Sequence, residues 1–220
     1  TYNSLTGRAA ETRLKPIKWN TATVVGNKAF YANIDFKDEN DQTLREKNRI
    51  VFTDNFKLDE AVVGTKFVDV GKNDGDEITV LHSSQNRLYV FKTRNIYIYR
   101  IQSAQSANFI LERHIAGIGC LHKHAVIDTP FGICFADHKQ VSLLRGTEVS
   151  ELSLLIRDTY QGLDATPNTG GFSLGYHPII NTLIFSYGFT DALAIMYAYN
   201  FDTQSWSKFD DSTGFYRSQF

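Results

Sequence analysis

The stretch that decides the fold is RLYVFKTRNIYIY, residues 87–99. Residues 88–91 are apolar without a break, and residues 96–99 put aliphatic side chains on one face of a strand and aromatic ones on the other. Strands that are half exposed to water alternate between polar and apolar residues, whereas strands covered on both faces are apolar throughout. These runs, joined by a loop at 93–95, therefore predict two strands that are buried on both faces.

Runs of the same kind lie on either side of this stretch, about fifteen in all and mostly four to seven residues long. Turn residues separate them. Gly26-Asn27 suits a tight two-residue hairpin turn, because glycine supplies the positive φ at the first corner. The sequence therefore predicts an all-β protein.

The runs also recur as units. Asn48-Arg49-Ile50-Val51-Phe52 is echoed by residues 86–91, then by 132–135 and by 181–185. A period of roughly 40–50 residues holding three or four strands is typical of β-propeller blades. We predict about four blades, at 13–72, 73–117, 118–165 and 166–212, in a single propeller domain or a fragment of a larger ring. A two-sheet sandwich is the alternative, but the outer faces of its sheets would be exposed to water, which does not suit strands that are apolar on both faces.

One segment has helical spacing. Between Ser150 and Gly162 the apolar residues Leu152, Leu155 and Tyr160 recur every three to five positions. Ser150 suits the N-cap, and Gly162 suits a left-handed terminator. We expect one short helix near 150–162.

Composition excludes several classes of protein. The 220 residues are 42% hydrophobic and 13% aromatic with a net charge of −1, which argues against intrinsic disorder and against a basic nucleic-acid-binding domain. No apolar run approaches the ~18–20 residues that a membrane-spanning helix needs. Two cysteines make no disulfide framework, and Cys120 and Cys134 are expected to be free thiols, with Cys134 in a core and opposite residue 127.

The only cluster of ligand-type residues is Cys120, His122 and His124. On a strand these three would share a face, and His114 or His138 would supply a fourth zinc ligand. The alternative is a solvated strand face without metal. We favour the alternative, because C-x-H-x-H is not an established zinc spacing, and we expect no metal or cofactor.

The segment Lys72–Glu77 resembles a calcium loop at first sight. An EF-hand needs oxygen ligands at the first, third and fifth positions before its glycine. Those positions are Val70, Lys72 and Asp74, so the match fails. A polar turn that enters a strand at 77–81 is the better interpretation.

Catalytic motifs are absent: there is no G-x-S-x-G, no H-E-x-x-H and no phosphate-binding loop. Convergence of carboxylates at a propeller centre would permit glycoside hydrolysis; the candidates are Asp35, Asp69, Asp137 and Asp158. The sequence does not indicate such convergence, and the sialidase-type box is missing. We therefore expect no enzymatic activity.

Aromatic residues leave open a surface on which sugars stack. The candidates are Tyr97, Tyr99, Tyr187, Tyr197, Tyr199 and Trp206. At strand spacing such residues more often belong to a core, which we favour. Trp206 is expected to cap the last blade.

Several strings, in order, resemble the propeller-bearing tail and head–tail connector proteins of tailed bacteriophages, including nozzle-type proteins. The resemblance covers about residues 48–209; its strings lie at 48–54, 67–71, 74–79, 87–92, 96–99, 118–120, 132–136, 155–157, 197–201 and 205–207. Two features depart from the family: Asp137-His138-Lys139-Gln140 stands where a glycine-containing turn is common, and family members are usually much longer. The chain begins at Thr1 and its only methionine is Met196, so we expect a processed chain or a piece of a longer polypeptide.

The resemblance implies a structural component of the virion, in the phage tail or neck, that forms or decorates the DNA exit conduit. It implies portal, adaptor and tail subunits and copies of the chain itself as partners, with transient contact with genomic DNA or the host surface. Such a protein is made in the host cytoplasm. The alternatives are a carbohydrate- or receptor-binding propeller and, less favoured, a propeller glycoside hydrolase.

Overall fold

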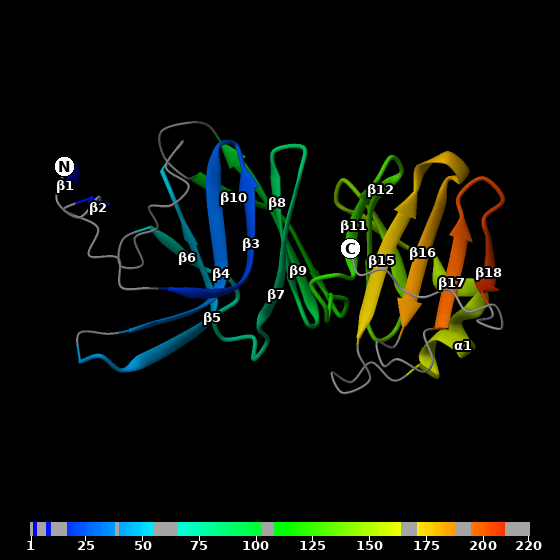
Figure 1. The fold of residues 1–220 in the computed structure, drawn as a ribbon, viewed down its shortest axis with the longest axis horizontal. Helices are drawn as coiled ribbons and strands as arrows, with labels where there is room; N and C mark the ends of the chain where they lie inside the picture. Colours follow the sequence, from blue (N-terminus) through cyan, green and yellow to red (C-terminus); the bar gives the residue numbers. More distant parts are fainter. Residues whose placement is uncertain are drawn as a thin grey trace. The chain divides into compact units, whose positions relative to one another are not determined.

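A computed structural model describes residues 2–3, 8–9, 17–37, 40–54, 66–102, 108–163, 171–187 and 195–209. The chain divides into two compact units, Thr1–Gly119 and Cys120–Phe220, and each is described by itself. A two-stranded pair, β1 (Tyr2–Asn3) and β2 (Arg8–Ala9), precedes the larger sheets (Figure 1).

The first unit holds two four-stranded antiparallel sheets. One contains β3 (Lys18–Val25), β4 (Lys28–Lys37), β5 (Thr43–Phe52) and β6 (Phe67–Asp69), hydrogen-bonded in that order. The other contains β7 (Ile78–Ser84), β8 (Arg87–Lys92), β9 (Asn95–Gln102) and β10 (Asn108–Ala116), again in chain order.

The second unit repeats this arrangement. Its first sheet contains β11 (Val126–Thr129), β12 (Gly132–Ala136), β13 (Val141–Arg145) and β14 (Glu148–Glu151). The 3-10 helix η1 (Ser153–Ile156) and the helix α1 (Arg157–Gln161) follow. The last sheet contains β15 (Phe172–His177), β16 (Thr182–Tyr187), β17 (Ile195–Asn200) and β18 (Ser205–Phe209), with the 3-10 helix η3 (Pro178–Ile180) between β15 and β16.

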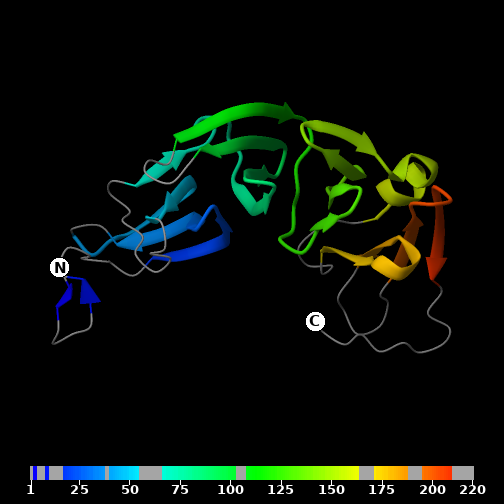
Figure 2. The ribbon, with the colours of Figure 1, turned by 90° about the horizontal axis from the view of Figure 1, so that it is seen from above.

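This architecture confirms the predicted fold class. Four consecutive sheets, each of four antiparallel strands joined in chain order, are the blade arrangement of a β-propeller, and one short α-helix accompanies them. Figure 2 shows the sheets of each unit as successive layers along the chain.

The sheets of the first unit pack through a shared apolar core. Phe30, Ile50, Leu88 and Val90 are all fully buried in it. Polar contacts fix the neighbouring strands β3 and β7, because Leu81 N–H donates to Thr21 Oγ1 at 2.9 Å. The central strands β8 and β9 are buried on both faces, as the sequence predicted: no side chain of residues 88–91 or 96–99 is more than 9% exposed.

The sheets of the second unit pack around an aromatic cluster. The rings of Phe172 and Phe185 lie 5.2 Å apart, and Tyr160 of α1 lies 5.2 Å from Phe185. The N–H of Leu174 donates to the carbonyl of His124 at 2.9 Å. The indole of Trp206 on β18 donates to the carbonyl of Leu152 at 2.8 Å, which ties the last strand to the segment after β14. The sequence predicted that Trp206 caps the last blade, and the structure adds that its indole N–H binds the segment after β14.

The helix differs from its prediction. Ser150 lies inside β14 and caps no helix, and Gly162 has φ −77°, which is not left-handed. The helical segment begins only at Ser153 and starts as a 3-10 turn. Leu155 is 74% exposed. The apolar spacing was correct for Tyr160, which is buried, but a 3-10 turn rotates Leu155 away from the face that an α-helix would bury.

Two local expectations concern hairpins. Gly26 and Asn27 both have positive φ, 54° and 64°, so the turn is of type I′ with left-handed conformation at both corners. Ile127 pairs with Cys134 across the β11–β12 hairpin, as predicted, and both cysteines are free and buried.

Candidate functional site

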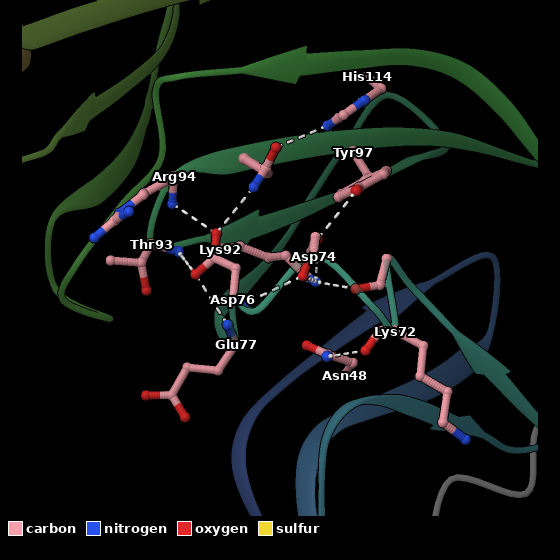
Figure 3. Close-up of polar contacts among 12 residues, drawn as sticks. Asn48, Lys72, Asp74, Asp76, Glu77, Lys92, Thr93, Arg94, Tyr97 and His114 are labelled. Atoms are coloured by element: carbon pink, nitrogen blue, oxygen red, sulfur yellow. Dashed lines mark hydrogen bonds and ion pairs between the residues drawn. The ribbon is translucent and has the colours of Figure 1, made fainter.

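The most densely bonded polar cluster in the described residues surrounds the loop between β6 and β7. This loop, residues 70–77, is the polar turn expected in place of a calcium loop. It joins the first sheet of the chain to the second, and Asn48 Nδ2 on β5 donates to the carbonyl of Lys72. Figure 3 shows the carboxylates of Asp74 and Asp76 directed toward the residues of the β8–β9 hairpin.

Asp74 binds a buried ammonium. The side chain of Lys92, at the end of β8, is 0% exposed and donates to Asp74 Oδ1 at 2.8 Å and to Oδ2 at 2.7 Å. Its third bond goes to the carbonyl of Gly71 at 3.1 Å. All three ammonium protons therefore have acceptors, which is what a charge needs when it is removed from water.

The carboxylate of Asp74 accepts two further hydrogen bonds. The hydroxyl of Tyr97 lies 3.2 Å from Oδ2, and the N–H of Asp76 donates to Oδ1 at 3.0 Å. Burial, followed by the negative charge of Asp74, raises the pKa of Tyr97 above its ordinary value, so this phenol stays protonated and donates.

Asp76 caps the β8–β9 hairpin loop. Its carboxylate accepts the N–H groups of Thr93 at 3.0 Å and Arg94 at 2.8 Å, and the side-chain amide of Asn95 at 3.1 Å. Burial alone would raise the pKa of Asp76, but these bonds and one from Glu77 N–H outweigh burial and lower it.

His114 extends the cluster to the surface. Its ring stacks on Tyr97 with centroids 4.3 Å apart and planes 8° from parallel. Its Nε2 lies 2.9 Å from Asn95 Oδ1. Because Asn95 Nδ2 already donates to Asp76, Asn95 Oδ1 is the acceptor here and His114 Nε2 carries the proton.

Chemically, this arrangement binds the chain to itself. Asp74 and Asp76 together accept from an ammonium, a phenol, backbone N–H groups and an amide, so their oxygens are engaged by the protein. A Cβ on Gly71, which has φ +55°, would overlap with the ends of the Asp74 and Tyr97 side chains, so any other residue would strain the backbone and displace groups of the cluster. We interpret the cluster as a polar clamp that fixes the loop against the β8–β9 hairpin.

Sequence reasoning found the loop but missed its partners. Lys92 ends an apolar run, which was a signal that its ammonium is buried, but the sequence does not indicate which carboxylate it meets. Gly71 and His114 carried no signal for their roles, since both depend on groups that lie far along the chain.

The zinc candidates are not arranged as expected. Residues 120–124 form no strand but a turn, so the alternation of side chains on one face does not apply. The thiol of Cys120 donates to the carbonyl of His122 at 3.2 Å, and the ring of His122 packs on Phe172. His124 is exposed.

The two proposed fourth ligands lie elsewhere: His138 is exposed in the β12–β13 turn, and His114 belongs to the polar clamp. Across the described ranges, no three His, Cys, Asp or Glu side chains are gathered in a way that would hold a metal ion.

Both cysteine thiols are expected to be unreactive in the folded chain. Burial, the largest influence in each case, raises the pKa of Cys120 to about 12 and that of Cys134 to about 12. The thiolate is the reactive form and the form that binds metals, so neither side chain is poised for such chemistry near neutral pH.

The four carboxylates considered for glycoside hydrolysis have different surroundings. Asp69 forms a two-pronged pair with Arg49, at 2.8 and 3.0 Å. Asp137 Oδ1 accepts the N–H groups of Lys139 and Gln140 and so caps the turn that departs from the phage family pattern. The other two are Asp35, which lies 3.7 Å from Arg45, and Asp158, which is exposed on α1.

The aromatic candidates belong mostly to the core. Tyr97, Tyr99, Tyr197 and Tyr199 are 9% exposed or less. Burial raises the pKa of Tyr99 to about 12. Tyr187 and Trp206 are partly buried. These side chains therefore offer little free ring surface to a sugar.

Comparison with known proteins adds similarity of structure alone. No protein-family model matches the chain, and no curated protein sequence matches it. It is similar to Hsv2 of Kluyveromyces lactis, at 12% identity and TM-score 0.42 over 88% of this chain and 62% of that chain, and to a second Hsv2 structure at 14% and 0.42 over 88% and 61%. Oligopeptidase B from Leishmania major matches at 14% and 0.38 over 86% and 24%. The chain spans less than two thirds of the Hsv2 structures, and similarity at this level carries no argument about function.

Proposed function

We propose that this chain is a structural component of a tailed-phage virion. It acts as a propeller module in the tail or head–tail connector and forms or decorates the conduit through which DNA leaves. The observation that carries the proposal is the polar clamp, in which Asp74 and Asp76, the carboxylates with the most hydrogen bonds among the described residues, bind the chain's own backbone and side chains. The phage resemblance of residues 48–209 is the second support.

A structural role implies partners and a place. Its partners are portal, adaptor and tail subunits and copies of the chain itself, assembled in the virion after synthesis in the host cytoplasm. The 23 Lys and Arg residues are balanced by 24 Asp and Glu residues, so the chain has no excess of cations to neutralise phosphates, and passing DNA would be bound weakly. Among the described residues, no helix is both long and apolar enough to cross a membrane.

We propose that the chain is not an enzyme. The carboxylates considered for hydrolysis, Asp35, Asp69, Asp137 and Asp158, lie near different cations or backbone groups or at the surface. An acid and a base for glycoside cleavage would need to face one bond across roughly 5–9.5 Å.

The test uses phage particles from cells that carry this reading frame. Particles banded in a density gradient are analysed by quantitative mass spectrometry. We expect peptides of this chain to sediment with the portal protein in a fixed ratio. If the chain is abundant in the lysate but absent from the particle band, the proposal is wrong.

A carbohydrate-binding role is the second candidate, and one observation favours it. Trp19 on β3 is 50% exposed, and its ring lies 4.8 Å from that of Tyr31, tilted by 54°. An exposed indole beside a tyrosine can stack on a sugar ring. Saturable binding on a glycan array that is lost in Trp19→Ala but kept in Val24→Ala, a control 51% exposed on the same strand, would favour this role over the structural one.

A further inference from the structure

Two arginines face each other across neighbouring strands of the second sheet. Arg87, the first residue of β8, is paired directly with Arg100 near the end of β9. Directly opposed residues of an antiparallel pair have Cβ atoms roughly 4.5–5.5 Å apart, and like charges at such positions destabilise the sheet. The two guanidiniums therefore need a negative charge close to them.

Glu112 on β10 supplies this charge from a β-bulge. The register of β10 against β9 shifts between Leu111 and Arg113, which leaves Glu112 as the extra residue. Bulges of this kind redirect a side chain. Glu112 Oε2 accepts the Nε–H of Arg87 at 2.6 Å, and Oε1 accepts N–H groups of Arg100. One carboxylate thus orients two guanidiniums.

The carboxylate of this group is covered, whereas its cations reach the solvent. The side chain of Glu112 is 10% exposed, against 25% for Arg87 and 55% for Arg100. The hydrogen bond from Arg87 lowers the pKa of Glu112, so the carboxylate is ionised at neutral pH. Both guanidiniums stay protonated as well. The three side chains together therefore present a net positive charge.

A third arginine adds to the charge of this face. Arg113 is exposed and pairs with Ile98, two positions before Arg100 on β9, so both arginines lie on the same face of the sheet. Glu112 is the only acidic residue in strands β7 to β10. Three arginines thus share one carboxylate on this face, which leaves a local excess of two positive charges.

A phosphate group suits this surface. Each guanidinium has five N–H donors in a planar fork that matches phosphate oxygens, and Glu112 occupies one donor of Arg87 and two of Arg100. Ser84 on β7 is paired directly with Arg87 and brings a hydroxyl to the same face. Because Glu112 already orients both forks, less side-chain freedom is lost on binding. A phosphate has enough oxygens to bridge two forks, whereas a carboxylate has only two.

We propose that Arg87 and Arg100, oriented by Glu112, bind a phosphate group. The chain as a whole has no excess of cations, so binding of phosphate depends on a local excess such as this one. A small phosphate compound and the backbone of DNA present the same chemistry, and the experiment below separates the two sources. The site goes beyond the proposed virion role and does not depend on it.

Phosphate titration followed by NMR tests the site. The ¹⁵N-labelled chain is titrated with sodium phosphate at neutral pH, and the Nε–H signals of its arginines are recorded. Sodium chloride at the same ionic strength is the control for screening. We expect saturable shifts of the Arg87 and Arg100 signals in phosphate and none in chloride. Equal shifts in the two salts, or shifts that do not saturate, would overturn the inference.

Substitutions of Arg100 test the geometry. Arg100→Gln should weaken phosphate binding by roughly ten-fold, because a charge-assisted fork is lost. Arg100→Lys keeps the charge without the fork and should weaken it by roughly three-fold. Binding by Arg100→Lys as tight as that of the unmodified chain would show that charge alone acts there, and the assigned geometry would be wrong.

Arg157→Gln is the matched control. Arg157 is 47% exposed and bonds to the single carboxylate of Glu151, so that pair has no excess charge, and its loss should leave phosphate binding unchanged. Arg100 is 55% exposed, so the fold should persist in its variants, which circular dichroism checks. Equal affinities of Arg100→Gln and Arg157→Gln for phosphate would overturn the inference.

A DNA titration identifies the source of the phosphate. Binding of a short labelled duplex is measured by fluorescence anisotropy at several salt concentrations. If the site holds DNA backbone, Arg100→Gln weakens duplex binding and lowers the slope of log K against log salt by about one, while Arg157→Gln does neither. Phosphate binding without an effect of Arg100→Gln on the duplex assigns the site to a small phosphate compound. Neither measurement needs virions, so failure of this site and failure of the virion role are distinguishable.

Discussion

The buried ammonium of Lys92 makes a sharp prediction about stability. Its side chain is 0% exposed, against 21% for its partner Asp74, so the two ends of the pair are unequal. Asp74→Ala leaves Lys92 with one acceptor, the carbonyl of Gly71. An uncompensated buried charge costs about 3–5 kcal/mol of the free energy of unfolding.

The reverse change should be milder. Lys92→Met removes the charge and keeps much of the volume, while Asp74 retains the Tyr97 hydroxyl, the Asp76 N–H and some access to water. We expect a loss of about 1–2 kcal/mol. The double variant should resemble Lys92→Met, so the second substitution restores about 2 kcal/mol to Asp74→Ala.

Urea unfolding measures these differences. Trp19 lies in the first unit and Trp206 in the second, so Trp19 fluorescence in a Trp206→Phe background reports the first unit alone. The control is Asp41→Ala, which removes an exposed pair with Lys37 and should cost less than about 1 kcal/mol. A loss below about 1 kcal/mol for Asp74→Ala, or additive losses in the double variant, would refute the reasoning.

Three more predictions follow from the same bonds and from burial. The pKa of Asp76 in the folded chain is lowered from 3.8, so the stability that its carboxylate contributes is present above pH 3.8 and is lost as the pH falls through the folded pKa. On acidification, the urea midpoint should therefore fall less for Asp76→Asn than for the unmodified chain. Cys120 and Cys134 should not react with a thiol reagent at pH 7.5 until urea unfolds the second unit, and rapid labelling of the folded chain would contradict their burial. Gly71→Ala should lower the melting temperature more than Gly75→Ala, because both have positive φ but an added Cβ meets other atoms only at position 71; equal effects in calorimetry would show that the cluster yields.

Much of the fold was predictable because a strand that is buried on both faces has apolar residues at consecutive positions, and this pattern is visible in the sequence. Ile96 and Tyr97 point to opposite faces of β9, and both are buried. The position of the short helix was predicted, but its N-terminus was not. Ser150, the expected N-cap, pairs with Leu143 in the ladder between β13 and β14 and therefore caps no helix. Strand pairing with residues elsewhere in the chain overrides such a local capping preference.

The candidate site was less predictable. Cys120, His122 and His124 look like ligands only if they form a strand, and a turn places them differently. Conversely, the clamp joins Asp74 to Lys92 and Asn95 to His114, which are 18 and 19 positions apart. No local spacing rule connects such residues, because their distance depends on how a loop and a hairpin meet.

The sequence by itself determined the β class, the repeating units of three or four strands and the near-neutral charge, since side-chain periodicity and composition are local properties of the chain. Only the tertiary structure decided what the polar residues do. Whether a carboxylate is a ligand, a catalyst or a clamp depends on which donors surround it. For Asp74 the donors are a buried ammonium and a phenol, supplied by strands that reach it only when the sheets are assembled.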